Sequence, residues 1–283
     1  MMKTLIGLEI HTQLSTRTKM FCRCANVTED VEPNVNVCPV CLGLPGSLPT
    51  INAQAVDFAI KTGLALNCTI AKHSKFDRKN YFYPDLPKGY QISQYDKPIC
   101  GPGYLEIQTA TGPKKIRLIR IHLEEDAAKS THPADSDYSL IDFNRAGTPL
   151  IESVTEPDLS TPEEARVFAQ AFRSILRYLR VSSADMEKGQ LRVDANINVI
   201  AEDGRKTPIT EIKNMNSFRS IERALKYEIE RHTELLKAGK EGEMIKETRG
   251  WVDGKGETVS QRSKEEMSDY RYFPEPDLPP LEP

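Results

Sequence analysis

Four of the six cysteines are clustered near the N-terminus in two close pairs. Cys22 and Cys24 form a C-x-C pair, and Cys38 and Cys41 form a C-x-x-C pair. Two thiolate pairs at this spacing can supply the four sulfur ligands, at ~2.3 Å, of a tetrahedral zinc site. Because protein would fill all four positions, such a zinc ion would be structural rather than catalytic. The alternative is a polar loop with incidental reduced cysteines.

A second set of residues that could do chemistry lies on the opening segment, where apolar and polar residues alternate. Residues 5–14 place Leu8 and Ile10 on one face and Glu9 and His11 on the other, which is the period of a β-strand. Residues two apart on one face have Cα atoms about 6.6 Å apart. Glu9 and His11 can therefore converge on one ion or water molecule.

Residues 115–126 and 190–200 repeat this alternation. Their polar faces carry Arg120, His122 and Glu124, and then Arg192, Asp194, Asn196 and Asn198. The first segment also ends in a cluster of carboxylates, Glu124, Glu125 and Asp126. A solvated sheet face usually carries Lys, Thr, Ser and Glu, whereas these residue types are ligands for metals and hydrogen bonds. An ordinary solvated face is the alternative interpretation.

If these three segments are neighbouring strands, their polar faces gather carboxylates around a divalent cation. Carboxylate-rich sites that retain water suit Mg²⁺, and Mg²⁺ usually accompanies a substrate that bears phosphate. His11 is an unusual ligand for so hard an ion. It could bind the metal directly, bind it through water, or act as a base.

Residues 75–90 combine basic side chains with three consecutive aromatic ones, Tyr81, Phe82 and Tyr83. Such a loop can hold phosphate by charge and a base by stacking, or its rings can pack the loop against the fold. Two more polar stretches, residues 144–149 and 211–216, could add hydrogen-bond donors. Neither a P-loop nor a dinucleotide-binding G-x-G-x-x-G is present, so a nucleotide site here would be of another kind.

Bulk properties favour an ordinary globular protein. The 283 residues suffice for one large domain or two smaller ones. The net charge of -3 means that contact with RNA would need a local basic patch or a partner. No apolar run approaches the ~20 residues of a membrane span. The chain enters a strand pattern at once, without a signal sequence, so we expect a cytoplasmic location and no membrane contact.

Three helices complete the predicted elements. One begins after Asn52, one after Thr161 with Glu164 closing a capping box, and one after Ser217 with a stop at Gly239. Their apolar stripes are typical of packing against a core. Together with the strands they predict an α+β fold, with a mixed or antiparallel sheet and helices on its apolar face.

The last residues differ in composition from the rest of the chain. Residues 269–283 are rich in proline, which predicts an extended segment similar to a linker. We therefore expect one catalytic domain over residues 1–268, with the zinc clip inserted within residues 20–44. Residues 269–283 would lead to a further domain.

Longer motifs are spread over almost the whole chain. They are GLEIH (7–11), FDRKNYFYPD (76–85), QISQ (91–94), EEDA (124–127), NRAGTPL (144–150), LRVDAN (191–196) and DYRYFPEPD (269–277). Together they resemble the N-terminal catalytic part of the B subunit of the aspartyl/glutamyl-tRNA(Asn/Gln) amidotransferase.

The resemblance implies a cradle-shaped domain that uses ATP and Mg²⁺ to phosphorylate the side-chain carboxylate of Glu-tRNA(Gln) or Asp-tRNA(Asn). Ammonia would then displace the phosphate. The ammonia would come through a tunnel from a glutaminase partner, the A subunit, and the small C subunit would complete the complex. Members of the family continue into a helical domain and a tail domain that binds tRNA.

From the strand faces, the loops and the resemblance together we assign roles to individual residues. The magnesium cluster would be Glu9, His11, Glu124 and Glu125, with Asp194 as a further catalytic candidate. Contacts to ATP or to the acceptor substrate would come from Lys79, Asn80, Tyr81, Arg145, Arg192, Asn196, Lys213 and Asn214. The alternative is a non-catalytic, zinc-bearing RNA-binding component of the same kind of complex.

Overall fold

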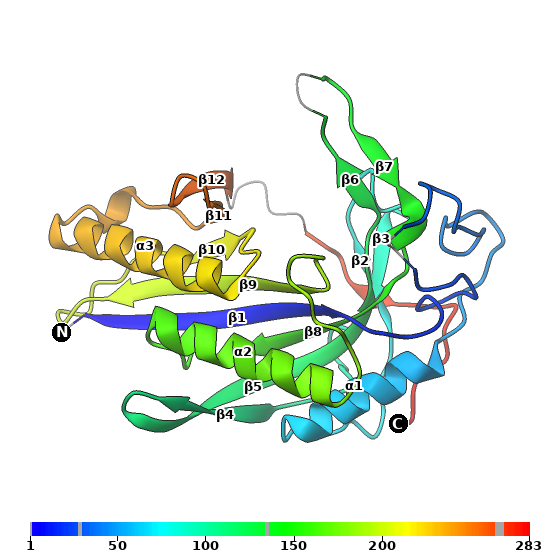
Figure 1. Cartoon of the computed structure of the whole chain (residues 1–283), viewed down its shortest axis with the longest axis horizontal. Coiled ribbons are helices and arrows are strands. Elements are labelled where there is room, and N and C mark those ends of the chain that lie inside the picture. The colour runs from blue at the N-terminus through cyan, green and yellow to red at the C-terminus, as the bar shows by residue number, and fades with distance from the viewer. Residues whose placement is uncertain (1, 28–29, 134–135, 264–268) are drawn as a thin grey trace.

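A computed structural model describes residues 2–27, 30–133, 136–263 and 269–283 of the chain. In these residues the chain forms one large mixed sheet, two small sheets and three α-helices. This is the α+β class that the sequence predicted. Figure 1 shows β1 running through the middle of the molecule, with the three helices packed beside the large sheet.

The large sheet has the strand order β12-β11-β10-β9-β1-β8-β5-β4 in the part of the chain described. Its central strand β1 (Lys3–Gln13) pairs antiparallel with β9 (Leu191–Ile200) on one side and β8 (Pro149–Thr155) on the other. The remaining strands are β4 (Gly103–Thr109), β5 (Gly112–Glu125), β10 (Thr210–Lys213), β11 (Glu247–Val252) and β12 (Glu257–Ser263). Strands β10 and β11 are parallel, which makes the sheet mixed.

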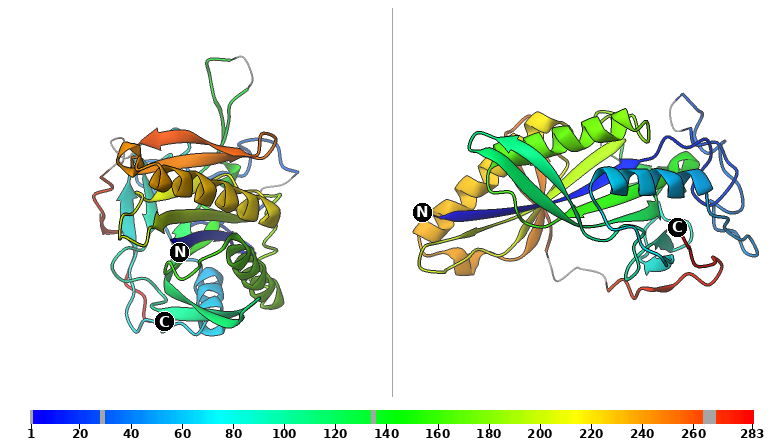
Figure 2. Two further views of the ribbon diagram at one scale, coloured as in Figure 1. Left: turned by 90° about the vertical axis from the view of Figure 1, so that its left-hand side faces the viewer. Right: turned by 90° about the horizontal axis from the view of Figure 1, so that it is seen from below.

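The helices cover one face of this sheet, as the views in Figures 1 and 2 agree. Helix α1 (Ala53–Ala65) contacts β5, α2 (Pro162–Tyr178) contacts β4, and α3 (Phe218–Lys237) contacts β9 and β12. Burial alternates at every residue of β9, with Leu191 and Val193 buried and Arg192 and Asp194 half-buried. The helices therefore lie on the apolar face, and the predicted polar face lies opposite them. No helix in the described segments has the length and apolar character to cross a bilayer.

The helix ends follow the predicted capping residues, with one difference. Asn52, Thr161 and Ser217 each accept a hydrogen bond from a backbone N–H of the first turn, and Gly239 follows α3 with a φ of 67°. The Glu164 carboxylate, however, accepts from the Ser160 backbone N–H at 2.7 Å instead of closing the box on Thr161. Thr161 still caps the helix, and only the return hydrogen bond falls one residue earlier than the motif predicts.

Two small sheets flank the large one. Strands β2 (Asp77–Asn80), β3 (Tyr90–Ser93) and β13 (Phe273–Pro274) form the first, and β3 contacts β5. Strands β6 (Lys129–Thr131) and β7 (Leu140–Asp142) form a hairpin that rises away from the body in Figure 1. The short 3₁₀ helices are η1 (Phe143–Arg145) and η2 (Glu241–Glu243).

The segment 269–283 is extended, but it is also docked on the domain. Its strand β13 pairs antiparallel with β2. The Arg78 guanidinium donates to both carboxylate oxygens of Glu275, at 2.7 and 2.9 Å, and to Asp277 at 3.1 Å. Because Glu275 is buried, this bidentate pair fixes the segment to the small sheet. The composition of the segment predicted a linker and gave no sign of this docking.

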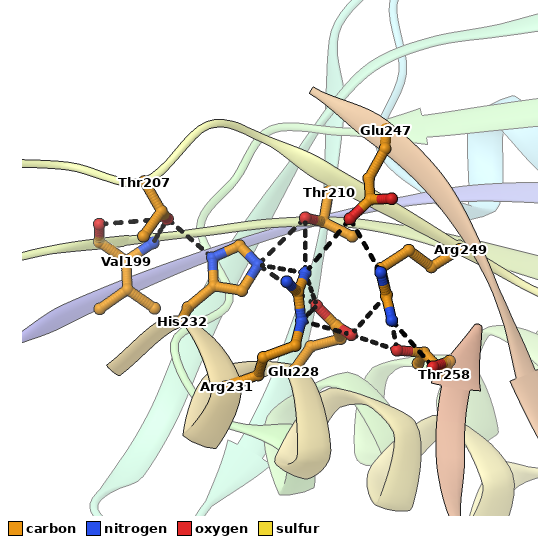
Figure 3. A network of polar contacts seen from close by, with 9 residues as sticks. All are labelled: Val199, Thr207, Thr210, Glu228, Arg231, His232, Glu247, Arg249 and Thr258. Carbon is orange, nitrogen blue, oxygen red and sulfur yellow. Dashed lines mark hydrogen bonds and ion pairs between the residues drawn. The ribbon is translucent and has the colours of Figure 1, made fainter. Parts of the chain in front are cut away.

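A buried charge network holds α3 to the far end of the sheet (Figure 3). Glu228 is fully buried and accepts from Arg231 at 2.7 Å and from the Thr258 hydroxyl, with Arg249 at 3.2 Å and His232 at 3.2 Å. Burial alone would raise the pKa of Glu228, but the hydrogen bonds from His232, Arg231 and Thr258 lower it to about 2. The network therefore stabilises the ionised carboxylate.

The same network holds β10. The two ring nitrogens of His232 lie 2.7 Å from the Thr207 hydroxyl and 3.0 Å from the Thr210 hydroxyl. Thr210 is the first residue of β10, whose polar residues Glu211 and Lys213 point to the opposite face of the sheet. Helix α3 thus fixes a strand that contributes to the polar face.

We expect Glu228→Gln to lower the free energy of unfolding by about 3–5 kcal/mol, because it removes the buried anion that Arg231 and Arg249 share and leaves Glu247 as the carboxylate for both. The stabilisation from Glu228 is present above the ordinary pKa of 4.5 and is lost as the pH falls toward its folded pKa of about 2. Urea unfolding at pH 7 and at acidic pH measures both effects. Glu230→Gln, at an exposed position of the same helix, is the matched control, and equal losses in the two variants would contradict the prediction.

Candidate active site

Strand register brings basic and acidic side chains into one row across the polar face. His11 on β1 lies opposite Arg192 on β9 and Glu152 on β8. Glu152 in turn lies opposite His122 on β5. Because directly opposed residues of antiparallel strands have close Cβ atoms, Glu152 lies in this row between the imidazoles of His11 and His122, with Arg192 beyond His11.

Two carboxylates lie between two imidazoles at the centre of this face. His11 Nε2 is 3.5 Å from Glu152 Oε2 and 3.8 Å from Glu124 Oε1. His122 Nε2 is 3.2 Å from Glu152 Oε2 and 3.3 Å from Glu124 Oε2. The ligand atoms of His11, Glu124 and Glu152 all lie within 4.8 Å of one another. These three residues, called the His–Glu cluster below, are close enough to share one cation.

The histidines keep both carboxylates ionised. Burial alone would raise the pKa of Glu152, but the charge of His122 and the hydrogen bond from His11 hold it well below its ordinary range. Burial would likewise raise the pKa of Glu124, yet the hydrogen bond from His122 lowers it. The cluster is therefore anionic in character, as a site for a hard cation requires.

The charge of His122 is set by opposing neighbours. Burial alone would lower its pKa, but the charge of Glu152 and the hydrogen bonds to Glu124 and Glu152 raise it to about 9. Arg120 Nε lies 3.3 Å from His122 Nδ1 and can donate to it only while the ring is neutral. Because His122 is buried beside both carboxylates, their attraction outweighs Arg120 and the ring carries the proton.

Glu9 and Asp194 lie on the same polar face, two residues before His11 on β1 and two residues after Arg192 on β9. They are opposed across β1 and β9. Glu9 accepts a 2.8 Å hydrogen bond from the Asn196 side chain, and burial together with the charge of Glu152 raises its pKa. Asp194 accepts from Lys213 Nζ at 3.1 Å. Both residues flank the His–Glu cluster and are not among its three ligand groups.

Glu125 is not placed with the predicted magnesium cluster. Its carboxylate lies 2.6 Å from Lys88 Nζ and accepts from the Ile92 backbone N–H at 3.1 Å. Consecutive residues of a strand point to opposite faces, so Glu124 and Glu125 on β5 cannot both face His11. Glu125 instead anchors β3 against β5.

Glu152 completes the cluster and His122 lies beside it, and the site residues predicted from the sequence include neither. The sequence pattern places His122 on the same period-two face as Glu124, but assigns it no role in the site. Glu152 follows the NRAGTPL motif on β8, where six of seven residues are buried, so no alternation in burial marks its side chain. Only the register of β8 against β1 and β5 reveals its position.

A pocket of about 400 Å³ opens beside the cluster. His11 and Glu124 are among its lining residues. Its other lining includes the predicted contact residues Lys79, Tyr81, Arg192, Lys213 and Asn214, and the catalytic candidate Asp194. Basic side chains next to an anionic cluster form a site that suits a metal ion together with a polyanionic ligand.

The basic residues of the pocket are held by acidic or aromatic neighbours. Arg192 Nη2 lies 3.0 Å from Asp126 Oδ1, and Lys213 Nζ lies 3.0 Å from Glu211 Oε1. Lys79 Nζ lies 4.7 Å from the centre of the Tyr270 ring, a cation–π contact. These contacts orient the cations before any ligand binds.

Three predicted contact residues do not line this pocket. Asn80 donates to the backbone carbonyl of Arg271 at 2.7 Å, and Arg145 donates to the backbone carbonyls of Ala127 and Ala128 at 2.9 and 2.8 Å. Both side chains therefore hold backbone segments in place by hydrogen bonds to their carbonyls. The third, Asn196, orients the Glu9 carboxylate on the polar face.

The four clustered cysteines lie together at one end of the molecule. The sulfur atoms of Cys22, Cys24, Cys38 and Cys41 are all within 4.8 Å of one another. A hydrogen bond from the Cys22 thiol, supported by the Cys38 backbone N–H and the nearby Lys19 ammonium, lowers the pKa of Cys41 to about 4. Four sulfur donors without a carboxylate among them fit zinc, and they would leave no position for substrate.

The two isolated cysteines lie in the hydrophobic core, as ordinary buried residues do. Cys68 and Cys100 are both buried. Burial raises the pKa of Cys68 to about 11 and that of Cys100 to about 12. Neither thiol is placed or ionised as a nucleophile would be.

Comparison with known proteins identifies relatives of the chain. A family described as the GatB/GatE catalytic domain matches residues 4–283. A protein of Thermotoga maritima, named as the B subunit of aspartyl/glutamyl-tRNA(Asn/Gln) amidotransferase, is 59% identical over 284 residues, covering 99% of this chain and 58% of that protein. Proteins of the same name from Thermomicrobium roseum and Dehalococcoides mccartyi are 57% and 56% identical, with 58% and 57% of their lengths covered. The chain thus spans little more than half the length of these relatives.

We expect Glu152→Gln to lower the pKa of His122 from about 9 toward or below the ordinary range of histidine. Loss of the carboxylate charge removes the main force that holds the ring proton, while Arg120 still favours the neutral ring. NMR titration of ¹³C-labelled histidine measures the change, with His122→Asn used to assign the signal. Glu156→Gln, just beyond the end of the same strand, is the control. An unchanged His122 titration in Glu152→Gln would contradict the charge assignment.

Proposed function

The chain belongs to the GatB/GatE catalytic domain family, and from that premise we propose that it activates a carboxylate in a tRNA-dependent amidotransferase. ATP would phosphorylate the side-chain carboxylate of Glu on tRNA(Gln), or of Asp on tRNA(Asn), and ammonia would then displace the phosphate. The observation that carries this proposal is the anionic His–Glu cluster beside a pocket lined by basic side chains.

The proposed chemistry explains why a nucleotide is consumed. A carboxylate at neutral pH cannot form an amide directly, because oxide is a very poor leaving group. In the first step a carboxylate oxygen attacks the γ-phosphorus of ATP and ADP leaves. In the second step ammonia attacks the acyl carbon, inorganic phosphate leaves, and the nitrogen loses a proton. Little covalent chemistry falls to the protein, so positioning and charge stabilisation dominate.

His11, Glu124 and Glu152 would hold Mg²⁺, since their ligand atoms share one small volume and the carboxylates are kept ionised. The bound cation would neutralise charge on the phosphate oxygens. In this proposal His122 stays beside both carboxylates as a fixed cation, 3.2 and 3.3 Å away. It would balance their charge without taking a position on the metal.

Lys79, Arg192 and Lys213 would bind the phosphate groups of ATP. All three line the pocket, and acidic or aromatic partners already orient them. Preorganised cations of this kind stabilise charge that develops in the transition state without reorganising. Tyr81 and Asn214, which also line the pocket, would supply contacts to the nucleotide or the acceptor end.

Glu9 is the acid–base candidate on the polar face. Burial and the charge of Glu152 raise its pKa, which brings a carboxylate closer to the operating pH and makes it a better proton acceptor. The Asn196 amide orients it at 2.8 Å. In the second step Glu9 would accept the proton that the attacking nitrogen loses.

The ammonia would come from a glutaminase partner, the A subunit of such a complex, and the small C subunit would complete the assembly. The proposal rests on the name shared by relatives that this chain covers over little more than half their length. We propose that misacylated tRNA is the acceptor and that the reaction takes place in the cytoplasm. The four clustered cysteines would bind a structural zinc ion away from the reacting groups.

We expect Glu124→Gln and Glu152→Gln to slow formation of the acyl phosphate by at least about 100-fold, because each removes a charge that would hold the metal. The assay is single-turnover transfer from γ-labelled ATP in the complete heterotrimer. The acyl phosphate is trapped by hydroxylamine, and Glu-tRNA(Gln) is compared with Asp-tRNA(Asn). Magnesium titration separates weakened metal binding from a slower step.

Glu106→Gln is the matched control, since Glu106 is exposed on the edge strand β4 and should leave the rate unchanged. If Glu124→Gln and Glu152→Gln still form the acyl phosphate at the normal rate, the catalytic assignment is wrong. The chain would then serve as a non-catalytic, zinc-bearing RNA-binding component of the complex.

For the cysteine cluster we expect about one zinc ion per purified chain. Cys38→Ser should lose that zinc, since it removes one of four sulfur ligands, whereas Cys68→Ala, in the core, should keep it. Elemental analysis of protein prepared without added chelator gives the metal content. A wild-type protein with far less than one zinc per chain would refute the zinc assignment.

A further inference from the structure

Lys19 is a buried lysine beside the cysteine cluster. Its side chain is 1% exposed. Its ammonium donates to the backbone carbonyl of Asn36 at 2.9 Å and approaches the Phe143 carbonyl at 3.5 Å and Cys41 Sγ at 3.6 Å. The ion pairs of the described residues include no carboxylate partner for it. A buried ammonium without an anion is costly, so its counter-charge has to be sought in the sulfur atoms.

Zinc binding would turn the cysteine cluster into that counter-charge. Four thiolates on one Zn²⁺ carry a net charge of -2, and neighbouring hydrogen-bond donors stabilise such a centre. The Cys38 backbone N–H already donates to Cys41 Sγ at 3.2 Å. Lys19 approaches the same sulfur, and it brings a full positive charge as well as a donor.

Lys19 also joins the cluster to the turn that leads into β8. Its backbone N–H donates to the Cys24 carbonyl at 2.9 Å, and the next residue, Met20, donates to Gly147 at 2.7 Å. Gly147 has a φ of 87°, and a Cβ there would lie 3.5 Å from Lys19 Cδ and 3.6 Å from Cys41 Cβ. One lysine therefore touches a metal-binding sulfur, the loop between the two cysteine pairs, and the 143–147 turn.

We infer that Lys19 is the charge partner of the zinc-bound cysteine cluster, holding zinc in place and fastening the cluster to the 143–147 turn. This inference rests on the zinc assignment of the proposed function and is independent of the proposed reaction. Lys19 is a positioning residue, because it would act through the cysteines and would touch no substrate.

The test compares zinc retention in Lys19→Met and in the wild-type chain, both purified with zinc. Zinc release to an excess of a chelating indicator should be about 10–100-fold faster in Lys19→Met, the range expected when an outer partner of a metal ligand is removed. Lys72→Met, at an exposed position, is the matched control and should release zinc at the wild-type rate.

Thermal unfolding with zinc and with chelator separates a metal partner from an ordinary buried residue. Lys19→Met should lower the melting temperature more with zinc than in chelator, because the anionic charge that Lys19 balances is largest when zinc is bound. Lys19→Gln keeps a donor for the two carbonyls but removes the charge. Lys19→Gln should also release zinc faster than the wild type. It is measured in the same two experiments, so that the test gives a result even if Lys19→Met does not fold.

Two outcomes overturn the inference while leaving the zinc assignment intact. One is that the Lys19 variants hold zinc as long as the wild type. The other is that they lose the same stability with zinc as with chelator. If instead the wild-type chain contains no zinc, the zinc assignment fails and the role of Lys19 fails with it. None of these outcomes affects the proposed activation of a carboxylate, which is tested separately with the Glu124→Gln and Glu152→Gln variants.

Discussion

Two ionised carboxylates held between two imidazoles are the constraint on which the rest of the structure depends. Glu124 and Glu152 are both buried, and together they would repel each other without His11 and His122 on the flanking strands. That arrangement exists only in one register of β1, β8 and β5. A slip of one residue in any of them would turn a charged side chain toward the helix-covered face, at a cost of several kcal/mol per buried charge.

The helices and outer strands keep that register. The apolar face of the sheet is packed by α1, α2 and α3, and β1 is hydrogen-bonded on both sides. The polar face therefore presents side chains from strands instead of loops, which limits their motion. Arg192 is held by Asp126 and Lys213 by Glu211. A polyanionic ligand would meet cations whose side-chain entropy has already been lost.

Local patterns in the sequence predicted the fold class, the helix starts and the polar face, because periodicity reflects which side of an element is buried. The clean alternation of residues 191–200 is the best example. The same rule excludes Glu125 from the face of Glu124, and applying it to every neighbouring pair would have corrected that assignment. Glu152 and the role of Asn80 depend on long-range pairing, of β8 with β1 and of β2 with the segment near Tyr270. No local pattern contains that information.

The cysteine cluster and the polar face are chemically distinct, yet one turn joins them. From the cysteine side, the Lys19 ammonium approaches the Phe143 carbonyl and the Met20 N–H donates to the Gly147 carbonyl. From the other side, the Gly147 N–H donates to the backbone carbonyl of Asp126 at 3.0 Å, and the Asp126 N–H donates to the Thr148 carbonyl at 2.8 Å. The Asp126 side chain then holds Arg192 in the pocket. A cluster that performs no reaction can therefore affect the site, because Lys19 and Met20 beside it contact the turn that positions Asp126, and through Asp126 a cation that faces the pocket.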